Sequence, residues 1–185
     1  MADLTGLKIA ILATDGFEES ELTSPYEALK VAGARVDIVA PHDGKIQGFT
    51  HFDKSKEVAV DKTLDEVKAD EYDAVHLPGG ALNADALRAE PKALQFLREV
   101  DQLGKPISAI CHAPWTLISA GLMLGRKITS YHTIQDDIRN AGGEWVDREV
   151  CEDTNWVTSR KPDDLPAFNR AAIALFRRLK QPLAA

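Results

Sequence analysis

The hydrophobic residues of this chain fall into short continuous runs that alternate with segments of helical periodicity. A run such as 7–14 has too few polar positions for a strand with one wet face, so it predicts a strand buried on both sides. Segments such as 91–104 repeat their apolar residues every three or four positions, with Pro at the start and Gly at the end, and predict helices. Strands are therefore expected at 7–14, 35–40, 72–80, 106–110, 144–151 and 155–159, and helices at 20–33, 91–104, 113–121, 133–141 and 163–180.

The alternation of strands and helices sets the expected architecture. It predicts an α/β fold, a three-layer sandwich in which helices cover both faces of a mostly parallel sheet. Residues 44–61 alternate loosely around two glycines and predict a hairpin or an excursion at the edge of the sheet. At 185 residues the chain is long enough to bury a substantial core, and we expect a single domain over 1–185.

Composition and charge narrow the classes of function. An apolar content of 44% and a charged content of 28% are ordinary for a globular protein and exclude the disordered and fibrous classes. The net charge of −7, without a cluster of Lys and Arg, argues against nucleic acid as a partner. The longest apolar runs are far shorter than the roughly 18 residues of a membrane span, and the first residues lack the pattern of a secretory signal. We therefore expect a cytoplasmic protein that binds neither nucleic acid nor membrane.

The two cysteines, Cys111 and Cys151, lie 40 positions apart. They form no Cys-x-x-Cys pattern, and no histidine stands at metal-ligand spacing from them. This spacing argues against a disulfide framework and a zinc site, and no metal or other cofactor is expected. In a reducing compartment each cysteine is either inert packing or reactive. Cys151 alternates with charged neighbours on an expected strand, and we interpret it as structural.

Three segments with chemically useful side chains follow expected strands. They are 14–21 with an acidic cluster, 78–85 with Gly79 and Gly80, and 111–114 with the adjacent Cys111 and His112. In an open α/β sheet, binding sites collect beyond the carboxyl ends of the strands. An acidic cluster, a glycine-rich backbone and a Cys–His pair are therefore expected to share one site.

Cys111 has the surroundings of a nucleophile on a tight strand-to-helix turn. Ala109 and Ala113 are small enough not to collide with such a turn. We predict a positive φ at Cys111, a conformation that costs a residue with a Cβ about 1–2 kcal/mol and persists only for function. Backbone N–H groups near the turn are expected to lower the pKa of the thiol and to receive an oxyanion, those of Gly79, Gly80 and His112. The alternative, a cysteine that only fills the core, stays open.

The histidines and acids have simpler interpretations beside their catalytic ones. Neighbouring helical residues point about 100° apart, so His112 reaches the thiol only if the turn redirects Cys111. Acids are favoured in the first turn of any helix, which is sufficient to explain the acidic cluster Glu18, Glu19 and Glu21. The remaining histidines are weaker candidates: His76 is expected in the core or an interface, and His42, His51 and His132 in loops.

Several motifs together resemble one known family along essentially the whole chain. They are GFEESEL, LPGG, AICHAP, SAG, GRKITSY, NAGGEWVDREV and NWVTSRKPDDLPAF. In this order they resemble the PfpI branch of the ThiJ/PfpI superfamily, which includes a parkinsonism-linked stress protein and cofactor-independent class III glyoxalases. The resemblance implies a flavodoxin-like fold, similar to that of class I glutamine amidotransferases. Those amidotransferases place a His-x-Glu pair late in the chain, and none of the five histidines here is followed by x-Glu, which argues against ammonia transfer.

Position by position, the resemblance implies four catalytic residues. Cys111 matches the nucleophile, His112 its histidine, and Glu21 the glutamate that faces the thiol. In PfpI-type oligomers an acid of the neighbouring subunit orients that histidine; the matching residue is Asp85, in a segment one residue longer than the common family version. The resemblance thus implies a homodimer or a larger homo-oligomer. We expect Glu21 to be protonated near neutral pH, so that it can donate a hydrogen bond to the thiolate.

Three functions are compatible with these residues. The first, which we favour, is a cofactor-independent glyoxalase or deglycase acting on small reactive aldehydes or on glycated protein side chains. The second is an intracellular cysteine peptidase, which needs the same atoms and an open cleft for a peptide. The third is a sensor of oxidative stress through oxidation of Cys111. Each fits a stress-response protein, and the chain shows no pattern of a peptide-binding groove, which ranks the peptidase below the carbonyl chemistry.

Overall fold

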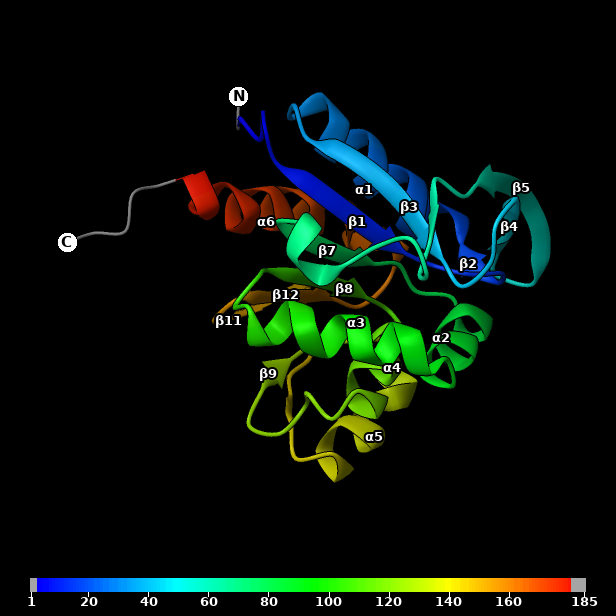
Figure 1. The fold of residues 1–185 in the computed structure, drawn as a ribbon. Helices are drawn as coiled ribbons and strands as arrows, with labels where there is room; N and C mark the ends of the chain where they lie inside the picture. Colours follow the sequence, from blue (N-terminus) through cyan, green and yellow to red (C-terminus); the bar gives the residue numbers. More distant parts are fainter. Residues whose placement is uncertain (1–2, 181–185) are drawn as a thin grey trace.

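A central sheet organises the computed structural model, which describes residues 3–180 (Figure 1). Its strands are β1 (Lys8–Leu12), β3 (Arg35–Ala40), β6 (Lys62–Thr63), β7 (Ala74–Leu77), β8 (Ile107–Ile110), β11 (Val150–Asp153) and β12 (Trp156–Ser159). They form one seven-stranded sheet in the order β11-β12-β8-β7-β1-β3-β6. Neighbouring strands are parallel except for β11 and β12. The predicted, mostly parallel sheet is confirmed.

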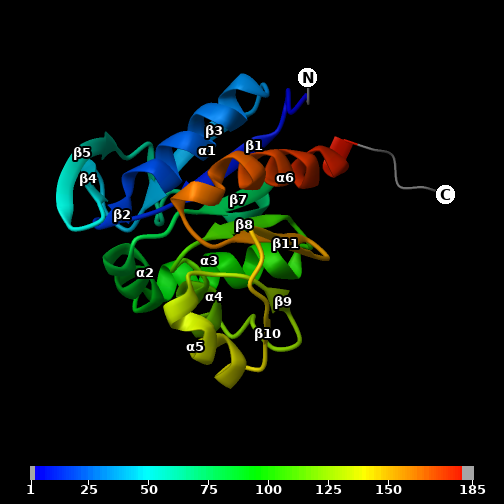
Figure 2. The same cartoon turned by 180° about the vertical axis from the view of Figure 1, so that it is seen from behind.

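Helices cover both faces of this sheet, as expected. One face carries α1 (Glu19–Val31) and α6 (Leu165–Arg177); the other carries α2 (Ala81–Arg88), α3 (Pro91–Gln102), α4 (Pro114–Ser119) and α5 (Gln135–Asn140) (Figures 1 and 2). Short 3-10 turns are η1 (Ala69–Glu71), η2 (His132–Ile134), η3 (Pro162–Asp164) and η4 (Arg178–Lys180). In the described part of the chain, no helix is both long and apolar enough to cross a membrane.

The central strands are buried on both faces because successive side chains of a strand point to opposite sides. On β1, Ala10 and Leu12 belong to the core that packs against α3 and α4. Ile9, which precedes Ala10 and points to the opposite face, belongs to the core built with α1 and α6. This double burial is the reason why the strands appear in the sequence as continuous apolar runs.

Residues 44–61 form the predicted hairpin, but in a sheet of their own. β4 (Lys45–Thr50) and β5 (Asp53–Ala59) are antiparallel, and β4 also pairs with β2 (Phe17–Glu18). These three strands form a separate sheet beside the main one (Figure 1). Because β2 leads directly into α1, this small sheet borders the acidic cluster.

Two regions differ from the predictions. The expected strand 144–151 is divided, since β10 (Glu144–Trp145) pairs with β9 (Lys127–Ile128) while β11 joins the main sheet. Residues 81–88, for which no helix or strand was predicted, form α2. Its periodicity is obscured because the helix follows two glycines and buries Asn83, a polar residue, at a position where an amphipathic pattern has an apolar one.

Candidate active site

The candidate active site lies beyond the carboxyl ends of three adjacent strands, where binding sites of parallel sheets collect. The loop after β1 leads to Glu21 in the first turn of α1. β7 ends just before Gly79, and β8 ends immediately before Cys111. Because the order of these strands in the sheet is β8-β7-β1, the three loops lie side by side. The predicted convergence of the three segments is therefore observed.

Cys111 occupies a strained turn between β8 and α4. Its φ is 63°, in the left-handed region that costs a residue with a Cβ about 1–2 kcal/mol. Two backbone hydrogen bonds hold it there: its N–H donates to the Ser159 carbonyl at 3.1 Å, and its carbonyl accepts from the Tyr131 N–H at 3.0 Å. Ala109 and Ala113 are both buried beside it. The predicted positive φ is confirmed.

The turn brings His112 to the thiol. The Cys111 sulfur lies 3.1 Å from Nδ1 of His112, although the two residues are neighbours in sequence. The imidazole stacks on the Tyr131 ring at 4.8 Å between centroids and meets the edge of Trp115 at 5.3 Å. Burial, and to a smaller extent the nearby charge of His132, lower the pKa of His112. The ring is therefore neutral at pH 7, and Nδ1 can accept the proton of the thiol.

Glu21 is a fully buried acid beside this pair. Its Oε2 accepts a hydrogen bond from the Gly79 N–H at 3.0 Å, and its Oε1 has no such partner within residues 3–180. Burial first, and then the charge on Glu18, raise the pKa of Glu21 to about 8. The carboxyl therefore carries a proton at neutral pH, as the sequence predicted.

The thiol of Cys111 differs from the expectation in one respect. Burial and the charge of an ionised Glu21 raise its pKa, and the N–H groups of Gly80 and His112 lower it by less. The prediction of a lowered pKa is wrong because it considered the N–H donors and not the burial of the sulfur. Cys111 is only 7% exposed. Since Glu21 is protonated at neutral pH, its charge does not oppose the thiolate there.

The glycine pair after β7 forms one wall of the site. A Cβ on Gly79 would collide with Glu21 Oε2 and would stand 2.6 Å from the Cβ of Cys111. Gly80 has a φ of 90°, and a hydrogen bond from its N–H lowers the pKa of the Cys111 thiol. The Gly79 N–H donates to Glu21 in this conformation, and its role toward an oxyanion stays a prediction. The donors that face the sulfur are those of Gly80 and His112.

Asn83 is a buried residue next to the site that the sequence did not single out. Its Nδ2 donates to the carbonyls of Pro78 and Gly79, each at 3.0 Å, and its Oδ1 accepts from the Thr14 N–H at 2.7 Å. It thus ties the glycine pair to the end of β1. An asparagine shortly after a glycine pair at a strand end was the available signal, but the Thr14 contact joins residues 69 positions apart.

The other candidates lie apart from the thiol. Asp85 is exposed on α2, and its side chain makes no hydrogen bond or ion pair within residues 3–180, so its reach to His112 across an interface stays a prediction. Glu18 accepts from the His51 N–H at 3.0 Å, and Glu19 pairs with Lys56 at 3.7 Å. Cys151 is buried with its sulfur 3.4 Å from the Lys127 carbonyl, consistent with a structural role.

The other histidines lie where the sequence predicted them. His76 is fully buried on β7; His42 lies after β3, His51 in the β4–β5 turn and His132 in η2.

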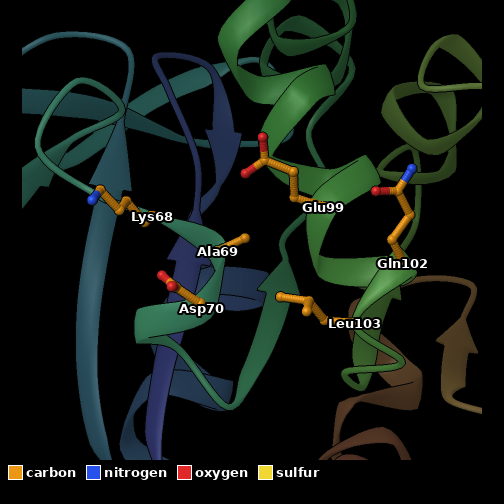
Figure 3. Close-up of a pocket in the computed structure, with 6 residues that line it drawn as sticks. All are labelled: Lys68, Ala69, Asp70, Glu99, Gln102 and Leu103. Atoms are coloured by element: carbon orange, nitrogen blue, oxygen red, sulfur yellow. The ribbon is translucent and has the colours of Figure 1, made fainter.

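A surface hollow of about 460 Å³ lies at the opposite end of the sheet, between η1 and the end of α3 (Figure 3). Its lining residues are Lys68, Ala69, Asp70, Glu99, Gln102 and Leu103. This hollow lies away from Cys111, because η1 and the end of α3 lead into the amino ends of β7 and β8, whereas Cys111 follows the carboxyl end of β8. Within residues 3–180, no group of three or more His, Cys, Asp or Glu side chains could hold a metal ion.

The chain is similar to proteins of one known family. The model of the DJ-1/PfpI family matches residues 7–175. Deglycase PfpI of Pyrococcus furiosus is 46% identical over 171 residues, which cover 92% of this chain and 100% of that protein. Protein/nucleic acid deglycase 2 of Escherichia coli is 46% identical over 169 residues, covering 91% and 96%. YraA of Bacillus subtilis, provisionally named a cysteine protease, is 42% identical over 170 residues, covering 92% and 98%.

The crystal structure of Drosophila melanogaster DJ-1beta has the same architecture. It aligns with a TM-score of 0.84 at 27% identity, covering 97% of this chain and 94% of that one. The flavodoxin-like fold implied by the sequence motifs is confirmed.

Proposed function

Because this chain belongs to the DJ-1/PfpI family, we propose that it is a cysteine-dependent glyoxalase or deglycase acting on methylglyoxal-type carbonyls or on their early adducts with protein side chains. One observation carries the proposal: the left-handed turn at Cys111 places its sulfur 3.1 Å from Nδ1 of a neutral His112. A base at this distance can generate the thiolate as the substrate arrives. The relatives named deglycases support the choice of carbonyl substrates.

The first step is addition of sulfur to the aldehyde carbon. His112 takes the thiol proton on Nδ1, and the thiolate of Cys111 attacks, so that a C–S bond forms and the carbonyl π electrons move to oxygen. The N–H groups of Gly80 and His112 face the sulfur and stabilise the developing oxyanion. Protonated Glu21 adds a neutral group instead of a second negative charge beside the thiolate.

The second step moves a proton between the two substrate carbons. The oxyanion first takes the proton back from His112, which gives the hemithioacetal and a neutral imidazole. His112 then removes the proton from the carbon bonded to sulfur and returns it to the neighbouring carbon, while the hydroxyl proton moves from the first oxygen to the second, and this leaves a thioester. Water then hydrolyses the thioester to a 2-hydroxy acid and restores the thiol. Methylglyoxal plus water gives lactate, with no net oxidation and no cofactor. The same addition consumes aldehyde released by early adducts on amines and thiols.

A peptidase is the second candidate, and the name of YraA favours it. It would use the same sulfur and imidazole. Cys111 is only 7% exposed, however, and a small aldehyde reaches such a buried sulfur more readily than a peptide bond does. Both cysteines are free, which supports a reducing, cytoplasmic location and leaves oxidation of Cys111 as a third use of the site.

The deciding experiment measures lactate formed from methylglyoxal without glutathione, in parallel with cleavage of an unstructured protein. We expect lactate from the wild type and from Cys151→Ser, and none from Cys111→Ser. The Cys151 variant is the matched control, since it also removes a buried thiol. Cleavage of the protein substrate without lactate, dependent on Cys111, would establish the peptidase instead. Neither reaction, together with rapid peroxide oxidation of Cys111, would establish the sensor.

A further inference from the structure

The backbone carbonyl of Glu21 lacks its regular helical partner. In an α-helix, the carbonyl of residue i accepts from the N–H of residue i+4. The residue four positions after Glu21 is Pro25, which lies inside α1 and has no N–H. Both residues are buried, so water cannot replace the missing donor. A buried carbonyl without a hydrogen-bond donor destabilises the fold, so another donor is needed.

His76, on β7, supplies that donor. Its Nε2 lies 2.8 Å from the Glu21 carbonyl oxygen, and its Nδ1 lies 3.0 Å from Oγ of Ser108. A carbonyl can only accept, so Nε2 carries the hydrogen and Nδ1 accepts from the Ser108 hydroxyl. His76 is fully buried, and burial lowers its pKa to about 4, so the ring stays neutral. Both ring nitrogens are therefore used, each in one fixed role.

The same contacts join the two halves of the candidate site. Ser108 stands opposite His76 in the β7–β8 register and lies on β8, three residues before Cys111. Gly79, three residues after His76, holds the Glu21 carboxyl through its N–H. The histidine thus lies between the backbone of the acid and the strand that delivers the thiol.

We propose that His76 is a positioning residue that replaces the missing Pro25 N–H and thereby fixes the place of Glu21 beside Cys111. The inference rests on the proposed function for the role of Glu21. The groups that act on the Glu21 carboxyl are Glu18, the Gly79 N–H and the thiol itself. On its other side His76 meets the uncharged ring of Phe168, at 5.7 Å between centroids. A residue that only filled space would need neither of the two hydrogen bonds.

The test measures the rate of Cys111 alkylation by iodoacetamide against pH, in a Cys151→Ser background so that one thiol is read. His76→Leu keeps an apolar volume and removes the donor. Without its fixed acid the thiolate loses a hydrogen-bond donor, so the alkylation pKa should rise by about half a unit or more, with an about threefold or larger loss of rate at pH 7. His76→Gln, whose amide can donate, should recover most of the loss.

Two further variants decide between positioning and simple damage to the fold. Val75→Ala removes buried volume from the adjacent position of the same strand, on its opposite face. An equal shift in Val75→Ala, or no shift in His76→Leu, would overturn the proposal. Pro25→Ala, added to His76→Leu, returns a helical N–H to the Glu21 carbonyl and should restore part of the alkylation rate. An unchanged rate in that double variant would show that His76 does not act through this carbonyl.

Alkylation requires no carbonyl turnover, which separates this inference from the proposed function. A wild type that makes no lactate but shows the His76 dependence of alkylation would refute the function and retain the positioning role. For an active enzyme, kcat for methylglyoxal should fall in His76→Leu while KM changes less, because Glu21 acts on the thiolate and not on substrate entry.

Discussion

Replacing Glu21 with Gln should stabilise the protein, and by an amount that increases with pH. In the native state the pKa of this carboxyl is raised to about 8 from its ordinary value of 4.5, because the side chain is fully buried. The native protein therefore binds this proton more tightly than the unfolded chain does. The contribution of the group to stability is most favourable below pH 4.5, and it is lost as the pH rises towards 8.

The magnitude follows from those two pKa values. Relative to a permanently neutral amide, the carboxyl costs the native state about 1 kcal/mol at pH 5, about 3 kcal/mol at pH 7 and about 4 to 5 kcal/mol at pH 9. Gln retains an oxygen that can accept the Gly79 N–H, so the packing changes little. The difference in free energy of unfolding between Glu21→Gln and wild type should follow this increase.

Urea unfolding at pH 5, 7 and 9 measures the difference directly. Glu19→Gln is the matched control from the same helical turn. A hydrogen bond from Ser55 and other contacts lower the pKa of Glu19, so its contribution is present at high pH and is lost as the pH falls. That substitution should therefore destabilise, with the opposite dependence on pH. A pH-independent difference for Glu21→Gln, or a destabilisation that grows with pH, would refute the assignment of a neutral buried acid.

Four other outcomes follow from the site. Glu21→Leu should raise the pKa of the Cys111 thiol, whereas Glu21→Gln should largely preserve it, because the amide of Gln can donate a hydrogen bond and Leu cannot. Thiolate titration at 240 nm measures this pKa, and equal values in the wild type and both variants would remove Glu21 from the site. Gly79→Ala should lower kcat/KM by about tenfold or more, since the new Cβ overlaps the Glu21 carboxyl and crowds the Cys111 side chain. Circular dichroism should show that the fold is retained, and a fully active Gly79→Ala variant would show that this close contact does not matter for activity. His132→Gln removes a nearby positive charge, so the pKa of His112 should rise and the acid limb of the kcat/KM profile should move to higher pH; an unmoved limb would show that this ring is not the base. If Asp85 serves a neighbouring subunit, Asp85→Asn should lower the rate of a dimer in sedimentation; a fully active monomer would exclude that role.

The sheet and its helices could be predicted because their residues interact with the core at regular intervals. Burial on both faces gives the strands continuous apolar runs, and Pro and Gly mark the ends of α3. The turn at Cys111 was also predictable, since small residues at 109 and 113 are a local requirement of its geometry. These signals lie within a few residues of the feature that they predict.

What the sequence did not show depends on contacts between distant segments. His76 appeared to be core because nothing near it indicates that the Glu21 carbonyl, 55 positions away, needs a donor. Asn83 attracted no interpretation for the same reason, since its contact with the Thr14 N–H joins residues 69 positions apart. The raised pKa of the thiol is a consequence of burial, and burial at one sulfur is set by the whole packing around it. Pro25, four residues after a catalytic candidate, is the one local signal that could have directed attention to His76.

The two hydrogen bonds that hold Cys111 have a consequence for the order in which the protein matures. Its partners are the backbone groups of Tyr131 and Ser159, 20 and 48 positions later in the chain. A chain is synthesised from its N-terminus, so the ribosome delivers the cysteine well before the residues that strain it. Until they arrive, the left-handed conformation has no support, and the thiol remains an ordinary one. The strained turn at Cys111 is therefore formed late in synthesis, when most of the sheet that encloses it already exists.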